Sequence, residues 1–228
     1  MRFVVSFIIV AVLLSGLCRE ASAISIGVGT RINKPVEDFR KLRKKNIVSQ
    51  TLDYSCGPAS LATLLSYYFQ DKVTEAQIIK YLLLTTELEK VKERRGFSLL
   101  DLKNFAKARG YEVIGYRMDL EYLVSLEQPV LIPLYIKDYS HFVIFRGLKG
   151  SRVFLADPAL GNMTMRVDKF LDLWRDGIGM VVSKTDKKFE EGPLVLSEAE
   201  KAVFADPNVM RKLFAPDIIG KIYADDEF

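Results

Sequence analysis

The sequence predicts an α+β fold in which an N-terminal helical lobe packs on an antiparallel β-sheet. In the first half of the chain, apolar residues recur at spacings of three and four, which is the helical period. From residue 111 onward the pattern changes to short runs that are rich in β-branched and aromatic residues. Helices that precede the strands, instead of alternating with them, are typical of two packed layers with a cleft between them.

Three helices are predicted between residues 56 and 110. The first opens at Gly57-Pro58, because proline is tolerated in a first helical turn, where its missing N–H would be unpaired anyway. The second follows Thr74-Glu75-Ala76-Gln77, which has the form of a capping box. Ser98 caps the third, Leu99 to Arg109, which ends at Gly110. The first helix places four apolar residues on one face: Leu61, Leu64, Leu65 and Tyr68.

Six strands and two short helices are predicted in the second half. Lys149-Gly150 is a turn signal, so we expect the strands on either side of it to pair as a hairpin. The strands are expected at Tyr111–Arg117, Pro129–Ile136, His141–Leu148, Arg152–Ala156, Met163–Val167 and Gly179–Ser183, and the helices near Leu120–Ser125 and Val167–Trp174.

The N-terminus has the layout of a secretory signal peptide. Met1-Arg2 precedes an apolar run from Phe3 to Leu14, and the small residues Ala21-Ser22-Ala23 mark a cleavage site after residue 23. An uncleaved anchor is the alternative, but a membrane span needs about 20 apolar residues. The longest later apolar stretch is Pro129–Ile136, so no stable membrane span is expected after cleavage. The chain is therefore expected to be exported to the periplasm.

Four segments are expected along the chain. They are a signal peptide at 1–23, an N-terminal extension at 24–46, a catalytic domain at 47–184 and a C-terminal extension at 185–228. The last begins with a charged run and continues into weakly helical stretches near Ser197–Phe204 and Pro207–Leu213. This extension is expected either to pack on the domain, to cover the cleft or to bind a partner.

Composition excludes several functional classes. The chain is 49% hydrophobic with a formal net charge of +4, which describes a globular protein and gives no reason to expect nucleic acid as a partner. Loss of Cys18 with the signal peptide leaves Cys56 as the single cysteine beside a single histidine, His141. One cysteine and one histidine cannot form an ordinary zinc site, so neither a metal nor another cofactor is expected.

Cys56 is the candidate nucleophile. It precedes a helix, where the helix dipole and unpaired backbone N–H groups favour thiolate over thiol. The alternative is that Cys56 is a small buried apolar residue, as most free cysteines are. Gln50 lies six residues upstream, and its side-chain amide is expected to form an oxyanion hole with the backbone N–H of Cys56.

His141 and Asp157 are the candidate base and orienting acid. His141 opens a predicted strand and Asp157 closes the next, so a hairpin would bring both to one end of the sheet. Asp157 would then accept a hydrogen bond from the imidazole and fix its tautomer. Each has an ordinary alternative, because lone histidines are often structural and Asp-Pro often opens a turn. Together with Cys56 they match an activated thiol peptidase.

Four segments carry a resemblance to a known family. The sequence resembles the peptidase C39 family, the bacteriocin-processing, double-glycine leader peptidases with a papain-like fold, over about residues 47–184. That resemblance implies Cys56 as nucleophile, His141 as base, Asp157 as orienting acid and Gln50 as the oxyanion glutamine. The segments are SQTLDYSCGPASLATLL, RGFSLLDLKNFAKARGYEV, SHFVIFRGLKGSRVFLADPALG and VDKFLDLWRDG.

The predicted export distinguishes this chain from the best-known family members, which are cytosolic domains fused to peptide-exporting transporters. It is more similar to stand-alone, exported C39-like proteins of Gram-negative bacteria, such as those encoded with the functional-amyloid secretion system of pseudomonads. The expected function is cleavage of a secreted or outer-membrane protein, for example a secretion or amyloid-system component. Two alternatives remain: a catalytically silent C39-like binding module, and another papain-like enzyme such as an amidase or acyltransferase.

Overall fold

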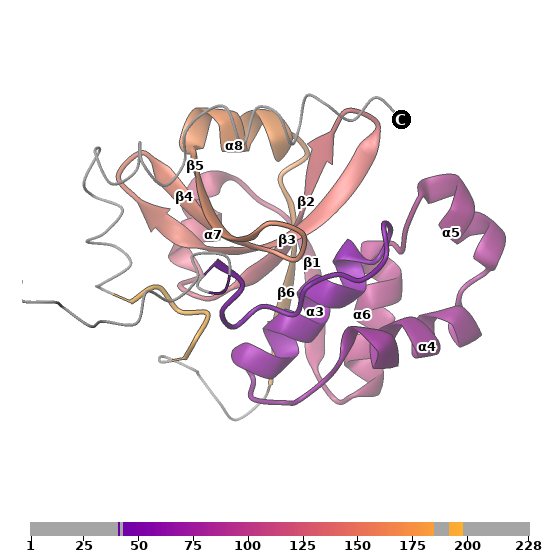
Figure 1. The fold of residues 1–228 in the computed structure, drawn as a ribbon. Helices are drawn as coiled ribbons and strands as arrows, with labels where there is room; N and C mark the ends of the chain where they lie inside the picture. Colours follow the sequence, from indigo (N-terminus) through magenta and orange to yellow (C-terminus); the bar gives the residue numbers. More distant parts are fainter. Residues whose placement is uncertain (1–40, 42, 185–191, 198–228) are drawn as a thin grey trace, which may run out of the picture. The chain divides into compact units, whose positions relative to one another are not determined.

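The computed structural model describes residues 41, 43–184 and 192–197. The predicted signal peptide, most of the N-terminal extension and the two helices expected near the C-terminus lie outside the described residues. In the described part of the chain, helices α3, α4, α5 and α6 come first and a six-stranded sheet follows (Figure 1). No helix in this part is both long enough and apolar enough to cross a membrane.

The helical lobe contains four helices where the sequence predicted three. They are α3 (Cys56–Tyr67), α4 (Glu75–Thr85), α5 (Leu88–Arg94) and α6 (Leu99–Ala108). The predicted capping box at Thr74 and the predicted cap at Ser98 are both confirmed, and Ser98 also forms a capping box, with Asp101. The prediction of three helices was wrong because α5 buries no residue, and a short charged helix without an apolar face leaves no periodic signal.

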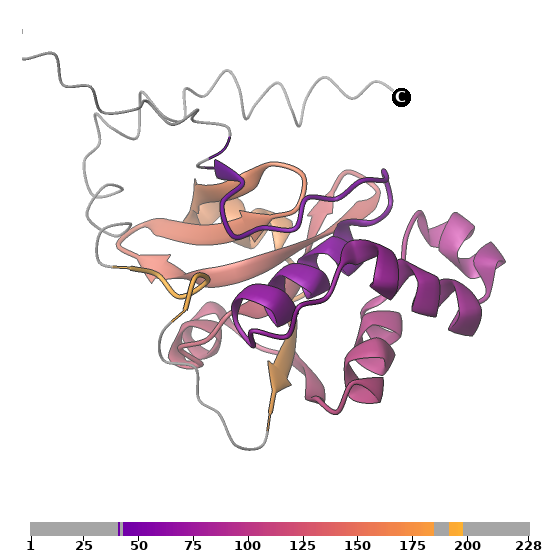
Figure 2. The same ribbon diagram turned by 60° about the horizontal axis from the view of Figure 1, so that its bottom comes forward.

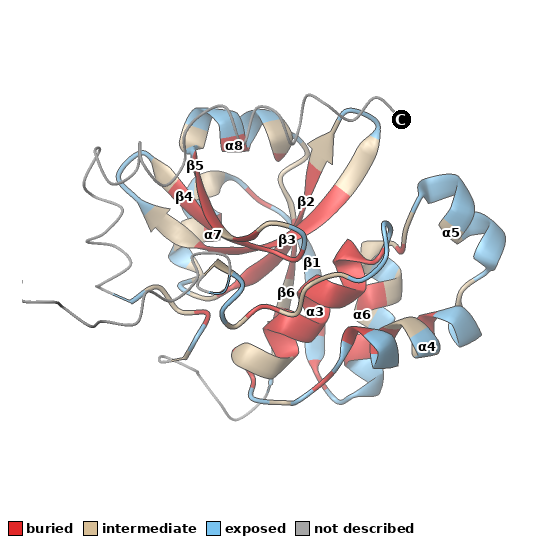
Figure 3. Cartoon of the chain, in the orientation of Figure 1, coloured by how far each residue is buried: buried red, intermediate tan, exposed pale blue. Residues whose placement is uncertain are grey.

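Helix α3 is buried on all sides, not only on the predicted apolar face. Ten of its 12 residues are buried, and Figure 3 shows this helix red for most of its length. Small residues let other elements approach closely. A Cβ added at Gly57 would lie 3.1 Å from Leu102 of α6 and 3.2 Å from Phe142 of the sheet. The helix that begins with Cys56 is therefore fixed between the helical lobe and the sheet.

The sheet is antiparallel throughout, with the strand order β1-β6-β2-β3-β4-β5. This arrangement confirms the predicted α+β class, and β3 and β4 form the predicted hairpin, with Lys149 opposite Arg152. The strands are β1 (Glu112–Arg117), β2 (Val130–Ile136), β3 (Tyr139–Lys149), β4 (Arg152–Asp157), β5 (Gly161–Arg166) and β6 (Ile178–Ser183), with α7 (Leu120–Ser125) before β2 and α8 (Val167–Leu173) before β6.

Both faces of the central strands are covered. On β3, Phe142 and Ile144 join a core cluster with α3, α4 and α6, whereas Val143 and Phe145 join a second cluster with α7 and α8. Alternate side chains of a strand point to opposite faces, so the sheet forms a middle layer between two sets of helices (Figures 1 and 2). Burial on both faces explains why these strands read as continuous apolar runs.

Residues 192–197 pack on the sheet beside β3. The buried guanidinium of Arg146 donates from Nε to the carbonyl oxygen of Leu194 at 2.9 Å and from Nη1 to Asn162 Oδ1 at 2.8 Å. The Leu194 side chain is 1% exposed and belongs to the core beneath α3. Among the described residues, this segment therefore contributes to the domain core although it lies beyond residue 184.

Candidate active site

Two hydrogen bonds join the first turns of α3 to β3. The Ser60 hydroxyl donates to the carbonyl oxygen of Phe142 at 2.9 Å, and the Phe142 N–H donates to Sγ of Cys56 at 3.5 Å. Both bonds use the backbone of the residue that follows His141, so they fix the position of the thiol relative to the histidine. Ser60 was not singled out from the sequence, although it lies one helical turn after Cys56.

His141 and Asp157 meet across the β3–β4 hairpin. Nε2 of His141 lies 2.9 Å from Oδ2 of Asp157, and the Asp157 side chain is fully buried. His141 is the third residue of β3 and not the first, because the strand begins at Tyr139. Oδ1 of Asp157 accepts from the backbone N–H groups of Ala159 at 2.7 Å and Leu160 at 3.0 Å, which fixes the carboxylate toward the imidazole.

Charge in this cluster favours an ion pair between the thiol and the imidazole. Burial opposes ionisation of His141, but the charge and hydrogen bond of Asp157 outweigh it and raise the pKa of His141 to about 10. Burial likewise opposes the thiolate of Cys56, but His141 and the Phe142 N–H lower its pKa below the ordinary value. Since Nε2 faces Asp157, Nδ1 is the ring nitrogen available to Cys56.

Tyr139 also contacts the thiol, and sequence reasoning left it out. Its hydroxyl lies 2.9 Å from Sγ of Cys56. The signal that could have identified it is strand periodicity, since Tyr139 precedes His141 by two residues and shares its face of the sheet. Cys56 itself is only 2% exposed.

Gln50 is held near the site by its backbone. Its N–H donates to the carbonyl oxygen of Pro158 at 3.0 Å, directly after Asp157. Its neighbour Thr51 donates its N–H and its hydroxyl to the buried carboxylate of Glu75, at 2.9 and 2.7 Å. The Gln50 amide nitrogen donates to the carbonyl oxygen of Leu52 at 3.2 Å, not toward Cys56, while its buried Oε1 has no partner.

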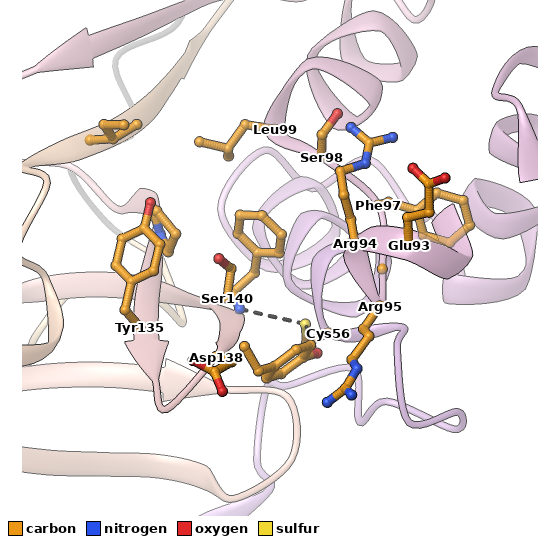
Figure 4. Close-up of a pocket in the computed structure, with 15 residues that line it drawn as sticks. Cys56, Glu93, Arg94, Arg95, Phe97, Ser98, Leu99, Tyr135, Asp138 and Ser140 are labelled. Atoms are coloured by element: carbon orange, nitrogen blue, oxygen red, sulfur yellow. Dashed lines mark hydrogen bonds between the residues drawn. The ribbon is translucent and has the colours of Figure 1, made fainter. Parts of the chain in front are cut away.

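A cleft of about 510 Å³ between the helical lobe and the sheet reaches Cys56. Figure 4 shows Glu93, Arg94 and Arg95 on the helical side, with Asp138 and Tyr135 on the sheet side. Cys56 lies between these two sides in Figure 4. Within the described residues, no three His, Cys, Asp or Glu side chains are grouped as a metal site would require.

Comparisons with known proteins bear on the family of the chain and on its fold. The model of the peptidase C39 family matches residues 44–187, more than half of the chain. A protein of Pseudomonas fluorescens named probable functional amyloid protease FapD is 36% identical over 146 residues, and the match spans 64% of each chain, just under two thirds. The Pseudomonas aeruginosa protein of the same name is 31% identical over 172 residues, covering 75% of this chain and 74% of that protein.

Solved structures give the same fold. The peptidase domain of Streptococcus ComA, a bi-functional ABC transporter, aligns with a TM-score of 0.53 over 61% of this chain and 98% of that domain, at 20% identity. A double glycine motif protease from an AMS/PCAT transporter, solved in complex with the leader peptide, aligns with a TM-score of 0.51 over 61% and 91%, at 28% identity. The expected papain-like architecture is confirmed.

Proposed function

Because this chain belongs to the peptidase C39 family and is therefore a cysteine peptidase, we propose that it cleaves an exported protein with Cys56 as the nucleophile, His141 as the acid and base and Asp157 as the orienting acid. The observation that carries this assignment is the contact of 2.9 Å between His141 Nε2 and Asp157 Oδ2. The same His141 ring interacts with the Cys56 thiol. Buried charge partners of this kind are the environment that activates a cysteine.

Acylation begins with Sγ of the Cys56 thiolate attacking the carbonyl carbon of the scissile bond. The oxygen of that carbonyl takes the negative charge, and the backbone N–H of Cys56, at the start of α3, would donate a hydrogen bond to it. The proton on Nδ1 of His141 passes to the amide nitrogen, the C–N bond breaks and the amine product leaves. A thioester on Cys56 and a neutral His141 remain.

Deacylation uses the same groups in reverse. Neutral His141 accepts a proton from water, and the resulting hydroxide attacks the thioester carbonyl. The C–S bond breaks, the thiolate re-forms, and the carboxylic acid product leaves and gives its proton to the solvent. Asp157 holds the imidazole in both steps and does not itself become protonated. We assign Gln50 as the side-chain donor of the oxyanion hole. This role requires its amide to turn from the Leu52 carbonyl toward the incoming oxygen.

The names of these relatives suggest the class of substrate. We propose that the chain processes a component of a functional-amyloid system, by analogy with the two probable functional amyloid proteases. The proposed location is the periplasm, because residues 1–23 have the layout of a signal peptide. Sequencing the N-terminus of the protein recovered from the periplasm tests this location, and Ile24 is the expected first residue.

Cleavage of a peptide library made from exported proteins tests the activity. The wild-type chain should create new peptide termini that are absent with Cys56→Ala and after treatment with iodoacetamide. Ser66→Ala is the matched control for a small polar change elsewhere on α3, and it should retain cleavage. Equal cleavage by Cys56→Ala would overturn the proposal. Absence of cleavage by the wild type, with peptides still retained, would favour a binding module.

A further inference from the structure

Tyr139 reaches the thiol from the same strand as His141. Its hydroxyl lies 2.9 Å from Sγ of Cys56, and its ring centroid lies 6.2 Å from that of His141. Tyr139 begins β3 directly after a tight turn in which Lys137 adopts a φ of 53°. The end of the β2–β3 hairpin therefore presents two polar side chains to one sulfur atom.

With Cys56 as the thiolate, the tyrosine is the donor in this contact. Burial and the neighbouring Cys56 thiolate raise the pKa of Tyr139 above its ordinary value, so the phenol keeps its proton. The thiolate carries the charge and has no proton to give. The contact is therefore an O–H group donating to a negatively charged sulfur, and hydrogen bonds to charged groups are stronger than those between neutral groups.

We propose that Tyr139 is a further catalytic residue whose hydroxyl donates to the Cys56 thiolate in the resting enzyme, which enlarges the thiolate population and weakens each thiolate as a nucleophile. This inference rests on the proposed function, because it requires Cys56 to react as a thiolate. A hydrogen bond to the charged form favours that form. A thiolate stabilised in this way attacks more slowly, since nucleophilicity falls as the thiol becomes more acidic.

The hydrogen bond from Tyr139 stabilises the thiolate mainly before it attacks the substrate. When the thiolate attacks, negative charge moves from sulfur to the substrate oxygen, and the bond from Tyr139 loses strength. A group that stabilises the resting state more than the transition state slows the step once all the sulfur is ionised. The same group speeds the reaction at a pH where few thiolates would otherwise exist.

Removing only the hydroxyl isolates its effect, because Tyr139→Phe keeps the ring and leaves every other group around the thiol unchanged. The Tyr54 ring, 6.4 Å from that of Tyr139, is one such neighbour. Among the described residues, the remaining titratable and charged groups are His141, Asp157 and Tyr135 on the sheet, Asp138 at the hairpin end, and Glu93, Arg94 and Arg95 across the cleft.

The test is the rate of Cys56 alkylation by iodoacetamide as a function of pH, measured on the full chain by mass spectrometry of the peptide that contains Cys56. Tyr139→Phe should raise the pH at which the alkylation rate is half its plateau value by about one unit, because a charge-assisted hydrogen bond to the thiolate is lost. We call this pH the midpoint. The substitution should also raise the plateau rate about threefold. The wild-type and variant curves should therefore cross. Tyr116→Phe, on the exposed strand β1, is the matched control and should change neither value.

A second variant keeps the Tyr139 hydroxyl and strengthens its hydrogen bond to the thiolate, so the midpoint should shift in the opposite direction. Placing 3-fluorotyrosine at position 139 gives a more acidic phenol and a stronger donor, so the midpoint should fall. An unchanged midpoint in both variants, with a lowered wild-type midpoint, would overturn the role of Tyr139 and leave the proposed function standing. Faster alkylation of Tyr139→Phe at every pH would show that the hydroxyl only covers the sulfur. An ordinary thiol profile in the wild type would overturn both proposals.

Discussion

Nε2 of His141 lies 2.9 Å from Oδ2 of Asp157, and the carboxylate has no exposed surface. Two backbone N–H groups of the turn after β4 hold the other carboxylate oxygen. The carboxylate therefore cannot turn away from the imidazole without breaking both of these hydrogen bonds. This arrangement stabilises an imidazolium next to Cys56, and its consequences can be measured in the pH dependence of the enzyme.

The first prediction concerns the pH dependence of turnover. The pKa of Cys56 is lowered, so activity should persist below the ordinary thiol value of about 8.5 and fall only when acid protonates the thiolate. The pKa of His141 is raised to about 10, so activity should fall again on the alkaline side as the imidazolium loses its proton. Steady-state kcat/KM measured between acidic and alkaline pH should give this broad bell.

The second prediction is that Asp157→Asn narrows the pH range over which kcat/KM is high, from both the acid and the alkaline side. The new amide keeps a side-chain oxygen for the turn, but the charge that raises the pKa of His141 is gone. The alkaline limb should move down in pH, and the acid limb should move up because the thiolate loses its cationic partner. We expect kcat to fall by at least about tenfold. Asp168→Asn, at an exposed ion pair with Arg166, is the control and should leave both limbs in place.

The sequence predicted the parts of this site in which residues close together in the sequence meet through a single hairpin. His141 and Asp157 are 16 residues apart in one hairpin, so strand ends and a turn signal were sufficient to bring them together. The central strands were predicted because both of their faces are buried. Helix α5 was missed because none of its residues is buried. The contact of Tyr139 with Cys56 joins residues 83 positions apart, and its geometry depends on how α3 packs on β3.

The third prediction concerns the oxyanion hole. Gln50→Ala removes the side-chain donor proposed for the developing oxyanion but none of the groups around the thiol. We expect kcat to fall about 100-fold or more, which is typical of the loss of one such donor. The pH midpoint of Cys56 alkylation should stay at the wild-type value. Gln128→Ala, in the loop before β2, is the matched control. A shifted midpoint would mean that Gln50 acts on the thiol instead.

The fourth prediction concerns the support of Gln50. The carboxylate of Glu75 accepts two hydrogen bonds from Thr51, at 2.9 and 2.7 Å, which ties the loop carrying Gln50 to the start of α4. Glu75→Ala leaves the Thr51 N–H without this partner and should lower the free energy of unfolding by about 1–3 kcal/mol. Because the loop that carries Gln50 is then held less firmly, kcat should fall by a larger factor than the rate of Cys56 alkylation. Glu89→Ala, on the exposed first turn of α5, tests whether loss of any acidic side chain has this effect.

The last prediction concerns the segment at 192–197. Leu194 is 1% exposed in the core beneath α3, and its carbonyl accepts from the buried Arg146 guanidinium. Leu194→Ala should lower the free energy of unfolding by about 2–5 kcal/mol, because it opens a cavity in a close-packed core. Leu84→Ala, at a side chain that is 80% exposed, should change it by less than about 0.5 kcal/mol.

Ending the chain at residue 191 should cost at least as much stability as Leu194→Ala, because it also removes the carbonyl oxygens of Pro193 and Leu194 from Arg146. A buried guanidinium without these acceptors is costly. Adding Arg146→Met to the shortened chain should then recover part of the loss, since the buried charge that has lost these two acceptors is gone. Urea unfolding of the five proteins measures each difference: the wild type, Leu194→Ala, Leu84→Ala, the shortened chain, and the shortened chain with Arg146→Met. A shortened chain as stable as the full one would show that the segment contributes nothing to the core.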